Sequence, residues 1–211
     1  MKNFLIYSLT IMMGSGLFAQ VNIPITNGDL EDQTALFKSK KFWKKWAVEG
    51  MFFNENAEPS KFDVSNSGLA PGEGIDNSQA LKSKVNDAEG KTADVTLAVG
   101  DTDISNYGPG TYKFTFYVKT ADAFSARPFW IVCSAIDEKK NDVSKQTLTH
   151  VDNGGTVAWK DLNNGYQEQS ITIKLTKNPE GKDAQFLRLQ IQHGRFDNTY
   201  FFDDFSLTKL D

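Results

Sequence analysis

Several stretches of this chain alternate apolar and polar residues, which is the period of a β-strand with one buried face. In residues 111–120 the apolar side chains, among them Phe114 and Phe116, take every second position, and Tyr117 falls on the polar side. Further alternating stretches are residues 20–25, 80–85, 93–99, 129–135, 144–150, 170–176, 186–193 and 200–207. Turns rich in Gly and Asn separate them, and no stretch has a convincing helical repeat. The pattern predicts an all-β, antiparallel β-sandwich.

The last of these stretches contains a carboxylate among apolar residues. One face of residues 200–207 consists of Phe201, Asp203, Phe205 and Leu207. Because three of the four are large and apolar, we expect this face to be buried, with Asp203 at the edge of the core. A carboxylate taken out of water is costly unless a cation or several N–H donors meet it. Asp203 therefore needs a partner.

A second acidic segment lies near the other end of the chain, in Asn27-Gly28-Asp29-Leu30-Glu31. If the first and last strands are neighbours, Glu31 and Asp203 can meet, and Asp29 or Asp204 could join them. Hard cations such as Ca²⁺ bind carboxylate and backbone carbonyl oxygens, so this pair is a candidate metal site. The alternative is that these acids cap turns or pair with lysines.

Residues 1–19 have the pattern of a secretory signal peptide. Lys2 precedes an apolar run from Phe4 to Met13, and Ala19 is the expected last residue removed. The run is too short to span a bilayer. We therefore expect the mature chain, residues 20–211, to be a single exported domain without a membrane span, in the periplasm, at the cell surface or secreted. Its one cysteine, Cys133, excludes an internal disulfide.

The charge balance bears on the class of partner. The chain has 23 basic and 27 acidic residues, a formal net charge of −4, which disfavours binding to nucleic acid or to anionic membranes. Residues 37–46 interleave five lysines with aromatic residues, as some nucleic-acid or membrane elements do. Given the overall charge, we interpret these lysines as solvated, with Phe42 or Trp46 packing on the sandwich.

The polar sides of the central strands carry residue types that suit sugars. If Phe114, Ile131 and Leu189 face inward, the outward residues are Tyr117, Trp130, Arg188, Gln190 and Gln192. An aromatic ring offers a flat platform to a pyranose, and Gln and Arg side chains pair with hydroxyl groups. Loop aromatics could form a rim: Trp43, Tyr107, Tyr166 and, as the strongest candidate, Trp159 in a Gly- and Asn-rich stretch. The alternative is that a loop covers Tyr117 and Trp130 as a second small core.

The sequence nominates no catalytic group. His150 and His193 have no Ser or Cys in a recognisable nucleophile motif, and Cys133 falls on an inward-facing position. Phosphate-binding loops and zinc motifs are missing from the sequence. A carboxylate pair, as glycosidases use, stays open because Asp and Glu are abundant. The sequence favours a binding protein over an enzyme.

Three motifs together resemble the carbohydrate-binding modules of the galactose-binding-like jelly-roll type, nearest to families 4, 9 and 22. They are the Asn27–Glu31 opening followed by Trp46, the Gly-Thr-Tyr-x-Phe-x-Phe strand from Gly110 to Phe116, and the terminal strand Phe202–Leu207. The resemblance covers nearly all of the chain after residue 20. It implies a jelly-roll fold, a glycan site on the concave sheet face, and a structural calcium held by Glu31 and Asp203.

These features predict an exported, non-catalytic module that binds a polysaccharide or oligosaccharide and contains a structural Ca²⁺. A separate glycan-degrading enzyme is an expected partner. Two alternatives stay open: a cell-surface interaction or adhesion domain that uses the same face for protein, and a small polysaccharide-active hydrolase or lyase. Glycan binding without release of reducing ends would distinguish the module from the enzyme.

Overall fold

The computed structural model describes residues 20–31, 38–40, 43–48, 50–55, 61–86, 95–124, 129–139, 141–148, 159–176 and 183–211. For residues 38–40, 43–48, 54–55, 144–148 and 159–160 it describes the backbone only. The predicted leader, residues 1–19, and the side chains of the lysine-rich stretch around Trp46 therefore lie outside the description. No helix in the described ranges has the length and apolar character that crossing a membrane requires.

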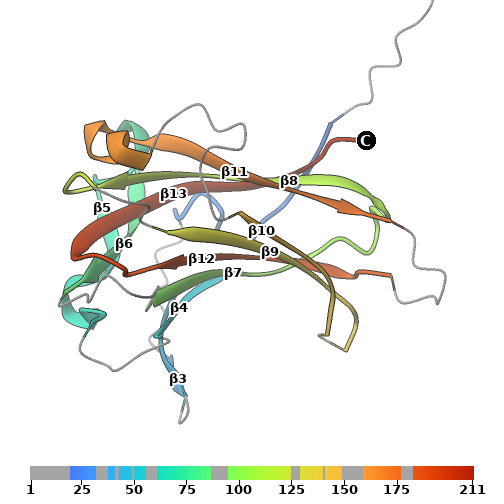
Figure 1. Ribbon diagram of the computed structural model, residues 1–211, viewed down its shortest axis with the longest axis horizontal. Helices are drawn as coiled ribbons and strands as arrows, with labels where there is room; N and C mark the ends of the chain where they lie inside the picture. The colour runs from blue at the N-terminus through green and yellow to red at the C-terminus, as the bar shows by residue number, and fades with distance from the viewer. Residues whose placement is uncertain are drawn as a thin grey trace, which may run out of the picture.

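Two antiparallel sheets, stacked one above the other in Figure 1, make up the described part of the chain. Sheet A has the order β11 (Gln167–Leu175), β8 (Gly110–Thr120), β13 (Asn198–Lys209), β6 (Gln79–Val85) and β5 (Gly68–Pro71), with β1 (Val21–Ile23) paired to β13. Sheet B has the order β10 (Asp142–Leu148), β9 (Trp130–Ile136), β12 (Phe186–His193), β7 (Val95–Asp103), β4 (Met51–Glu55), β3 (Trp43–Val48) and β2 (Lys38–Lys40). Short 3₁₀ helices are η1 (Val64–Asn66), η2 (Ile75–Asn77) and η3 (Trp159–Asn164). The predicted all-β sandwich is confirmed.

The alternation in β8 is realised as a buried face and a partly exposed face. Its inward residues are fully buried: Tyr112, Phe114, Phe116 and Val118. The ring centroid of Phe116 lies 5.8 Å from that of Phe205 and 6.4 Å from that of Phe202, both in sheet A. It also lies 6.4 Å from the ring of Phe129, which directly precedes β9 of sheet B. Aromatic packing across the two sheets thus forms the centre of the core.

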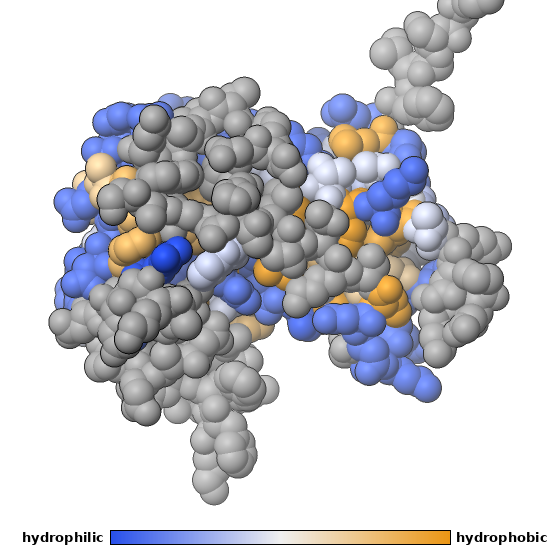
Figure 2. All heavy atoms as spheres, viewed as in Figure 1, coloured by the Kyte–Doolittle hydropathy of each residue, from blue (hydrophilic) through white to orange (hydrophobic). Residues whose placement is uncertain are grey.

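The two layers are visible in the space-filling view. At the right of Figure 2, hydrophobic residues lie between hydrophilic residues above and below them. Polar side chains are therefore left on the outer faces of the two sheets, where ligands have access, and the outer faces are the surfaces that concern function.

The first strand is short and lies at an edge, as its proline predicts. Val21 to Ile23 pair with Lys209 to Leu207 of β13, and in the described residues no other strand pairs with β1. Pro24 follows the last paired residue, so its missing N–H removes no hydrogen bond from the sheet.

The last strand departs from its predicted alternation. Phe202, Phe205 and Leu207 lie in the core, whereas Phe201 is only half-buried. The cause is a β-bulge, because the pairing of β13 with β8 shifts between Asp203 and Ser206, and Asp204 has a φ of 46°. An extra residue changes the side on which the following residues point. The prediction was wrong for Phe201, which shares the outer side with Asp203, and right for Phe205 and Leu207.

Candidate functional site

Four of the predicted ligand residues lie together on the outer side of sheet B, which we call the sheet B face. They are Trp130 of β9 and Arg188, Gln190 and Gln192 of β12, and all four are half-buried. The residues between them, such as Ile131 and Leu189, are buried in the core. The alternation of β9 and β12 therefore gave the correct side for each of these four side chains.

The register of the strands arranges these side chains in rows across the sheet B face. One row consists of Trp130, Gln192 and Thr96, and the next of Val132, Gln190, Ala98 and Phe52. Directly opposed residues have Cβ atoms about 5 Å apart, so each row is a line of neighbouring side chains. Trp130 lies on β9 and Phe52 on β4. These two strands are three strand spacings apart, which is about 14 Å across the sheet. The amides of Gln190 and Gln192 lie between these two aromatic residues.

Phe52 was not among the residues singled out from the sequence. It adjoins Met51 and Phe53, which are both fully buried, so three consecutive apolar residues concealed the alternation. The only signal in the sequence was the run of three apolar residues itself. Between the larger side chains, the central positions of the face are short and buried: Thr96, Ala98, Val132 and Ser134.

Arg188 is held in position by an ion pair at the end of the face. Its Nε lies 2.7 Å from Oδ1 of Asp101, with exposed side-chain fractions of 31% and 19%. The pairing of β12 with β7 shifts between Leu187 and Leu189, so that Gly100 and Asp101 together oppose Arg188. This bulge brings the carboxylate beside the guanidinium. Arginine has five N–H donors, and this contact uses one of them.

Tyr117 does not lie on the sheet B face. It belongs to β8 of sheet A, and its half-buried side chain is on the opposite side of the sandwich from Trp130. Its hydroxyl donates to Oε2 of Glu168 at 3.4 Å. Burial, together with the charge of Glu168, raises the pKa of Tyr117. The prediction of one surface joining Tyr117 to Trp130 is wrong, because alternation does not specify which sheet a strand joins.

Trp159 also belongs to an element on the side of sheet A. It is the first residue of η3, which contacts β8 and is drawn near β11 in Figure 1. Its side chain is outside the description, so its role as a rim residue stays a prediction.

The outer side of sheet A carries a lysine between two aromatic rings. Nζ of Lys119 lies 4.9 Å from the ring centroids of Tyr166 and Phe201, and 3.1 Å from Oε2 of Glu73. The Tyr166 hydroxyl donates to the backbone carbonyl of Glu73 at 2.8 Å. A cation above an aromatic ring is an attractive contact, and here it occupies the space in which a sugar would stack. The aromatic residues of the sheet B face are therefore the better platform.

The predicted metal ligands Asp203 and Glu31 both form hydrogen bonds with the segment of residues 75–79. Asp203 is fully buried, and its Oδ2 accepts from the backbone N–H of Ile75 at 2.8 Å and the hydroxyl of Ser78 at 3.1 Å. Its Oδ1 accepts from the N–H of Asp204 at 2.8 Å. Oε1 of Glu31 accepts from the N–H of Gln79 at 3.0 Å. The two acids therefore hold residues 75–79 against the outer side of sheet A.

Negative charge gathers around this segment. Burial, and to a smaller extent the charge of Glu31, raises the pKa of Asp203 although its hydrogen bonds lower it. Burial and then the charges of Asp203, Asp29, Asp76 and Glu31 raise the pKa of Asp204. In the described part of the chain, no Lys or Arg forms an ion pair with these five acids. A cation would relieve this repulsion.

The acids alone do not make a complete metal site. The described residues contain no group of three or more His, Cys, Asp or Glu side chains that could hold a metal ion. Calcium takes six to eight oxygen ligands, including backbone carbonyls and water. Glu31 and Asp203 therefore suit a calcium only if such oxygens supply most of its ligands.

A buried Ser–His pair, not foreseen from the sequence, joins the two sheets. Oγ of Ser83 in β6 lies 2.7 Å from Nε2 of His193 in β12, and both side chains are fully buried. Nδ1 of His193 lies 3.2 Å from the carbonyl oxygen of Ile191. A neutral ring that donates from Nδ1 to this carbonyl can accept the Ser83 hydroxyl at Nε2. The two residues are 110 positions apart in the sequence. The only indication in the sequence was that His193 falls on the inward side of its alternating stretch.

The surroundings of His193 make this pair structural. The imidazole ring contacts the rings of Phe53, Tyr200 and Phe202 at centroid distances of 5.9, 4.8 and 5.4 Å. Burial lowers the pKa of His193 to about 4. A substrate has no access to a pair enclosed in this way.

Comparison with known proteins identifies the fold. No protein-family model matches the chain, and no curated protein sequence matches it. A solved structure described as "CBM4 structure and function", of a carbohydrate-binding module, aligns with 88% of this chain and 99% of its own, with 14% identity and a TM-score of 0.53. A "putative sugar binding protein" from Bacteroides thetaiotaomicron VPI-5482 aligns with 90% of this chain and 100% of its own, with 14% identity and a TM-score of 0.55. A cyclase from Fischerella sp. TAU aligns with 89% of this chain and 96% of its own, with 16% identity and a TM-score of 0.49.

At these identities the similarity concerns the fold. The chain is a jelly-roll β-sandwich of the kind found in carbohydrate-binding modules. The expectation for the fold that the sequence motifs supported is thereby confirmed.

Proposed function

We propose that the protein is a non-catalytic carbohydrate-binding module whose ligand lies on the sheet B face. The observation that carries this proposal is the arrangement in rows, which sets the amides of Gln190 and Gln192 between Trp130 and Phe52. The aromatic rings offer apolar surface to the C–H face of a sugar, and the amides donate and accept hydrogen bonds with its hydroxyl groups. Arg188, oriented by Asp101, adds further donors at one end.

The chemistry of the rest of the molecule supports binding without hydrolysis. Ser83 and His193 have the atoms of a nucleophile and its base, but they are enclosed between the sheets. Asp203 and Glu31 accept hydrogen bonds from residues 75–79, on the opposite side of the sandwich from Trp130. A separate glycan-degrading enzyme would then act on the polysaccharide that this module holds.

Replacing Trp130 by alanine should weaken binding to the preferred polysaccharide by about 1–3 kcal/mol, as truncation of a central aromatic anchor does. Gln190→Ala should cost less, because it removes hydrogen bonds and no stacking surface. Affinity gel electrophoresis against xylan, cellulose derivatives and β-glucans measures both effects. Tyr117→Ala is the matched control on the opposite sheet and should leave mobility in the gel unchanged. If Tyr117→Ala weakens binding and Trp130→Ala does not, the ligand lies on sheet A.

We further propose that the acids around residues 75–79 hold a structural Ca²⁺, with Glu31 and Asp203 as carboxylate ligands and backbone carbonyls as others. The support is that burial, and after it the charges of four neighbouring acids, raises the pKa of Asp204, together with the oxygen preference of calcium. When bound, the ion would neutralise repulsion between the acids of β13, Asp203 and Asp204, and those of the segment that follows β1, Asp29 and Glu31.

Chelation should therefore lower the melting temperature, and added Ca²⁺ should restore it, because an ion that binds only the folded chain stabilises it by mass action. Glu31→Gln should lose this response while still folding. Glu168→Gln, an exposed acid on β11, is the control and should keep it. A melting curve that chelation leaves unchanged in the unmodified protein would count against the calcium and leave the acids as acceptors for residues 75–79.

A further inference from the structure

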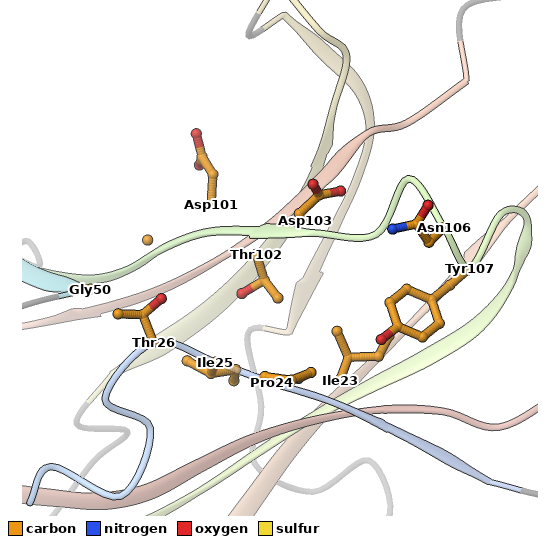
Figure 3. A pocket seen from close by; sticks show the side chains of 11 residues that line it. Ile23, Pro24, Ile25, Thr26, Gly50, Asp101, Thr102, Asp103, Asn106 and Tyr107 are labelled. Carbon is orange, nitrogen blue, oxygen red and sulfur yellow. The ribbon is translucent and has the colours of Figure 1, made fainter.

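A cavity of about 600 Å³ opens at an edge of the sandwich, in a place that the proposed sheet B face does not use (Figure 3). We call it the edge pocket; residues 23–26, residues 100–103, Asn106 and Tyr107 line it. Its volume falls in the range of about 300–1,000 Å³ that is usual for small-molecule sites.

The strand order explains why a cavity forms here. β4 begins at Met51, which pairs with Val99, so in the described residues no strand of sheet B lies beside residues 101–103 on the edge of β7 that faces away from β12. Residues 23–26 follow β1, which belongs to sheet A. The two sheets therefore diverge at this edge. Gly50 closes one end of the pocket. It lies so close to Thr26 that a Cβ atom on it would overlap the carbonyl oxygen of Thr26.

The hydroxyl of Thr102, a largely buried residue, points into the edge pocket and has no partner among the described residues. Thr102 is 7% exposed, and its side chain extends from β7 toward Pro24 and Ile25 of the facing segment (Figure 3). Among the described residues nothing forms a hydrogen bond with its hydroxyl group. The Thr102 oxygen is not one of the fully enclosed polar atoms of the described residues, so it is reachable from the pocket. A ligand with polar groups could therefore form a hydrogen bond with it.

The other groups around the pocket define the chemistry of that ligand. Thr26 extends from the opposite wall toward β7, and Tyr107 and Asn106 lie at the far end (Figure 3). Ile23, Pro24 and Ile25 supply an apolar wall. Thr102 therefore faces a neutral mixture of hydroxyl, amide and apolar groups, which matches a molecule with several hydroxyls and one apolar face.

The charges near the pocket disfavour an anion. Asp101 and Asp103 flank Thr102 and extend from the other side of β7 (Figure 3), and neither Lys nor Arg lines the pocket. Asp101 is paired with Arg188, and Asp103 accepts from the N–H of Ser105 at 2.8 Å. Nζ of Lys209 donates to the carbonyl of Tyr107 at 2.9 Å at the far end, but the two carboxylates beside Thr102 disfavour a phosphate or uronate there.

We propose that the edge pocket is a second saccharide site, which takes one or two residues of a neutral sugar, such as the end of a glycan chain. That the ligand is a sugar rests on the proposed function. That it binds at this edge rests on the pocket alone. Thr102 and Thr26 would pair with sugar hydroxyls, and the segment from Ile23 to Ile25 would contact the apolar face of the ring.

Amide chemical shifts of the ¹⁵N-labelled protein, titrated with D-glucose, D-xylose, cellobiose and xylobiose, test this site. Saturable shifts are expected at residues 23–26 and 100–107, and they should persist in Trp130→Ala, which disables the sheet B face. Thr102→Val keeps the shape and removes the hydroxyl, so it should weaken the response about tenfold. Thr26→Trp changes an exposed residue, fills the pocket and should abolish the response. Thr172→Val, an exposed threonine on β11, should behave as the unmodified protein.

The outcomes separate the pocket from the proposed function. Sugar-dependent shifts around Trp130 and Gln190 without any at Thr26 and Thr102 would overturn the edge pocket and leave the function standing. Shifts at the pocket alone would support the pocket and overturn the sheet B face. A pocket that responds to Ca²⁺ or to glucosamine, and to no neutral sugar, would be a cation site, and the saccharide proposal would be wrong.

Discussion

Acidification from pH 6.5 to pH 4 is expected to lower the free energy of unfolding by about 3 kcal/mol through His193 alone. Burial holds the pKa of this imidazole at about 4 in the folded chain, against an ordinary value of 6.5. Between these values the unfolded chain binds a proton that the folded chain does not. The stability that depends on neutral His193 is therefore complete above pH 6.5 and is lost as the pH falls toward 4. Below pH 4 both states bind the proton, and this loss ends.

Urea unfolding of the unmodified protein and of His193→Gln, at several pH values from about 7 to about 4, measures this effect. Glutamine can still accept the Ser83 hydroxyl and does not titrate, so the variant should lose much less stability on acidification. The pKa values of Asp203 and Asp204 are raised, so their protonation favours the folded chain and acts in the opposite direction. Both proteins contain these acids, so their difference isolates His193. Equal losses in the two proteins would assign the acid sensitivity to other groups.

Asp203→Ala should lower the free energy of unfolding by about 3 kcal/mol at neutral pH. The change removes a desolvated charge, which by itself favours folding, because burial raises the pKa of Asp203. It also leaves three donors without their acceptor: the N–H groups of Ile75 and Asp204 and the hydroxyl of Ser78. An unpaired donor costs about 1–3 kcal/mol when it is buried, and these three hydrogen bonds are partly buried, so each loss lies toward the lower end of that range. Three such losses outweigh one relieved charge.

This measurement is made with a chelator present, so that loss of a cation does not add to the difference. Asp211→Ala is the control, since Asp211 also accepts from a backbone N–H and a hydroxyl, those of Thr111, but at an exposed position. Its removal should change stability little because water replaces the lost acceptor. If Asp203→Ala is no more destabilising than Asp211→Ala, the carboxylate does not hold residues 75–79 in place.

The sequence predicted the strands and their inward sides well where a strand has regular neighbours. In β8 and β12 the inward residues are apolar at every second position apart from Thr120 and His193, and burial follows the alternation. Water on one side and the core on the other are enough to determine this. The side chains of Trp130 and Gln190 were placed correctly for the same reason.

The alternation of apolar and polar residues does not reveal which distant strands and side chains a strand contacts. A sandwich has two outer faces, so the outward position of Tyr117 did not reveal that β8 joins a different sheet from β9. The bulge at Asp204 depends on how β13 pairs with β8 and shifted Phe201 to the outside. Ser83 and His193 meet only because β6 and β12 lie in facing sheets. Each of these features depends on contacts between residues far apart in the sequence.

The position of β13 has a consequence for how the protein is made. Residues 198–209 follow all the other described strands in the sequence, yet they form the middle of sheet A, with β8 along one edge and β6 and β1 along the other. Sheet A therefore cannot close until this segment has left the ribosome. Pairings between such distant segments form slowly, and the unpaired edges of β8 and β6 are exposed to aggregation during that time. We expect the folding of this domain to depend on protection of those edges until residues 198–209 join them.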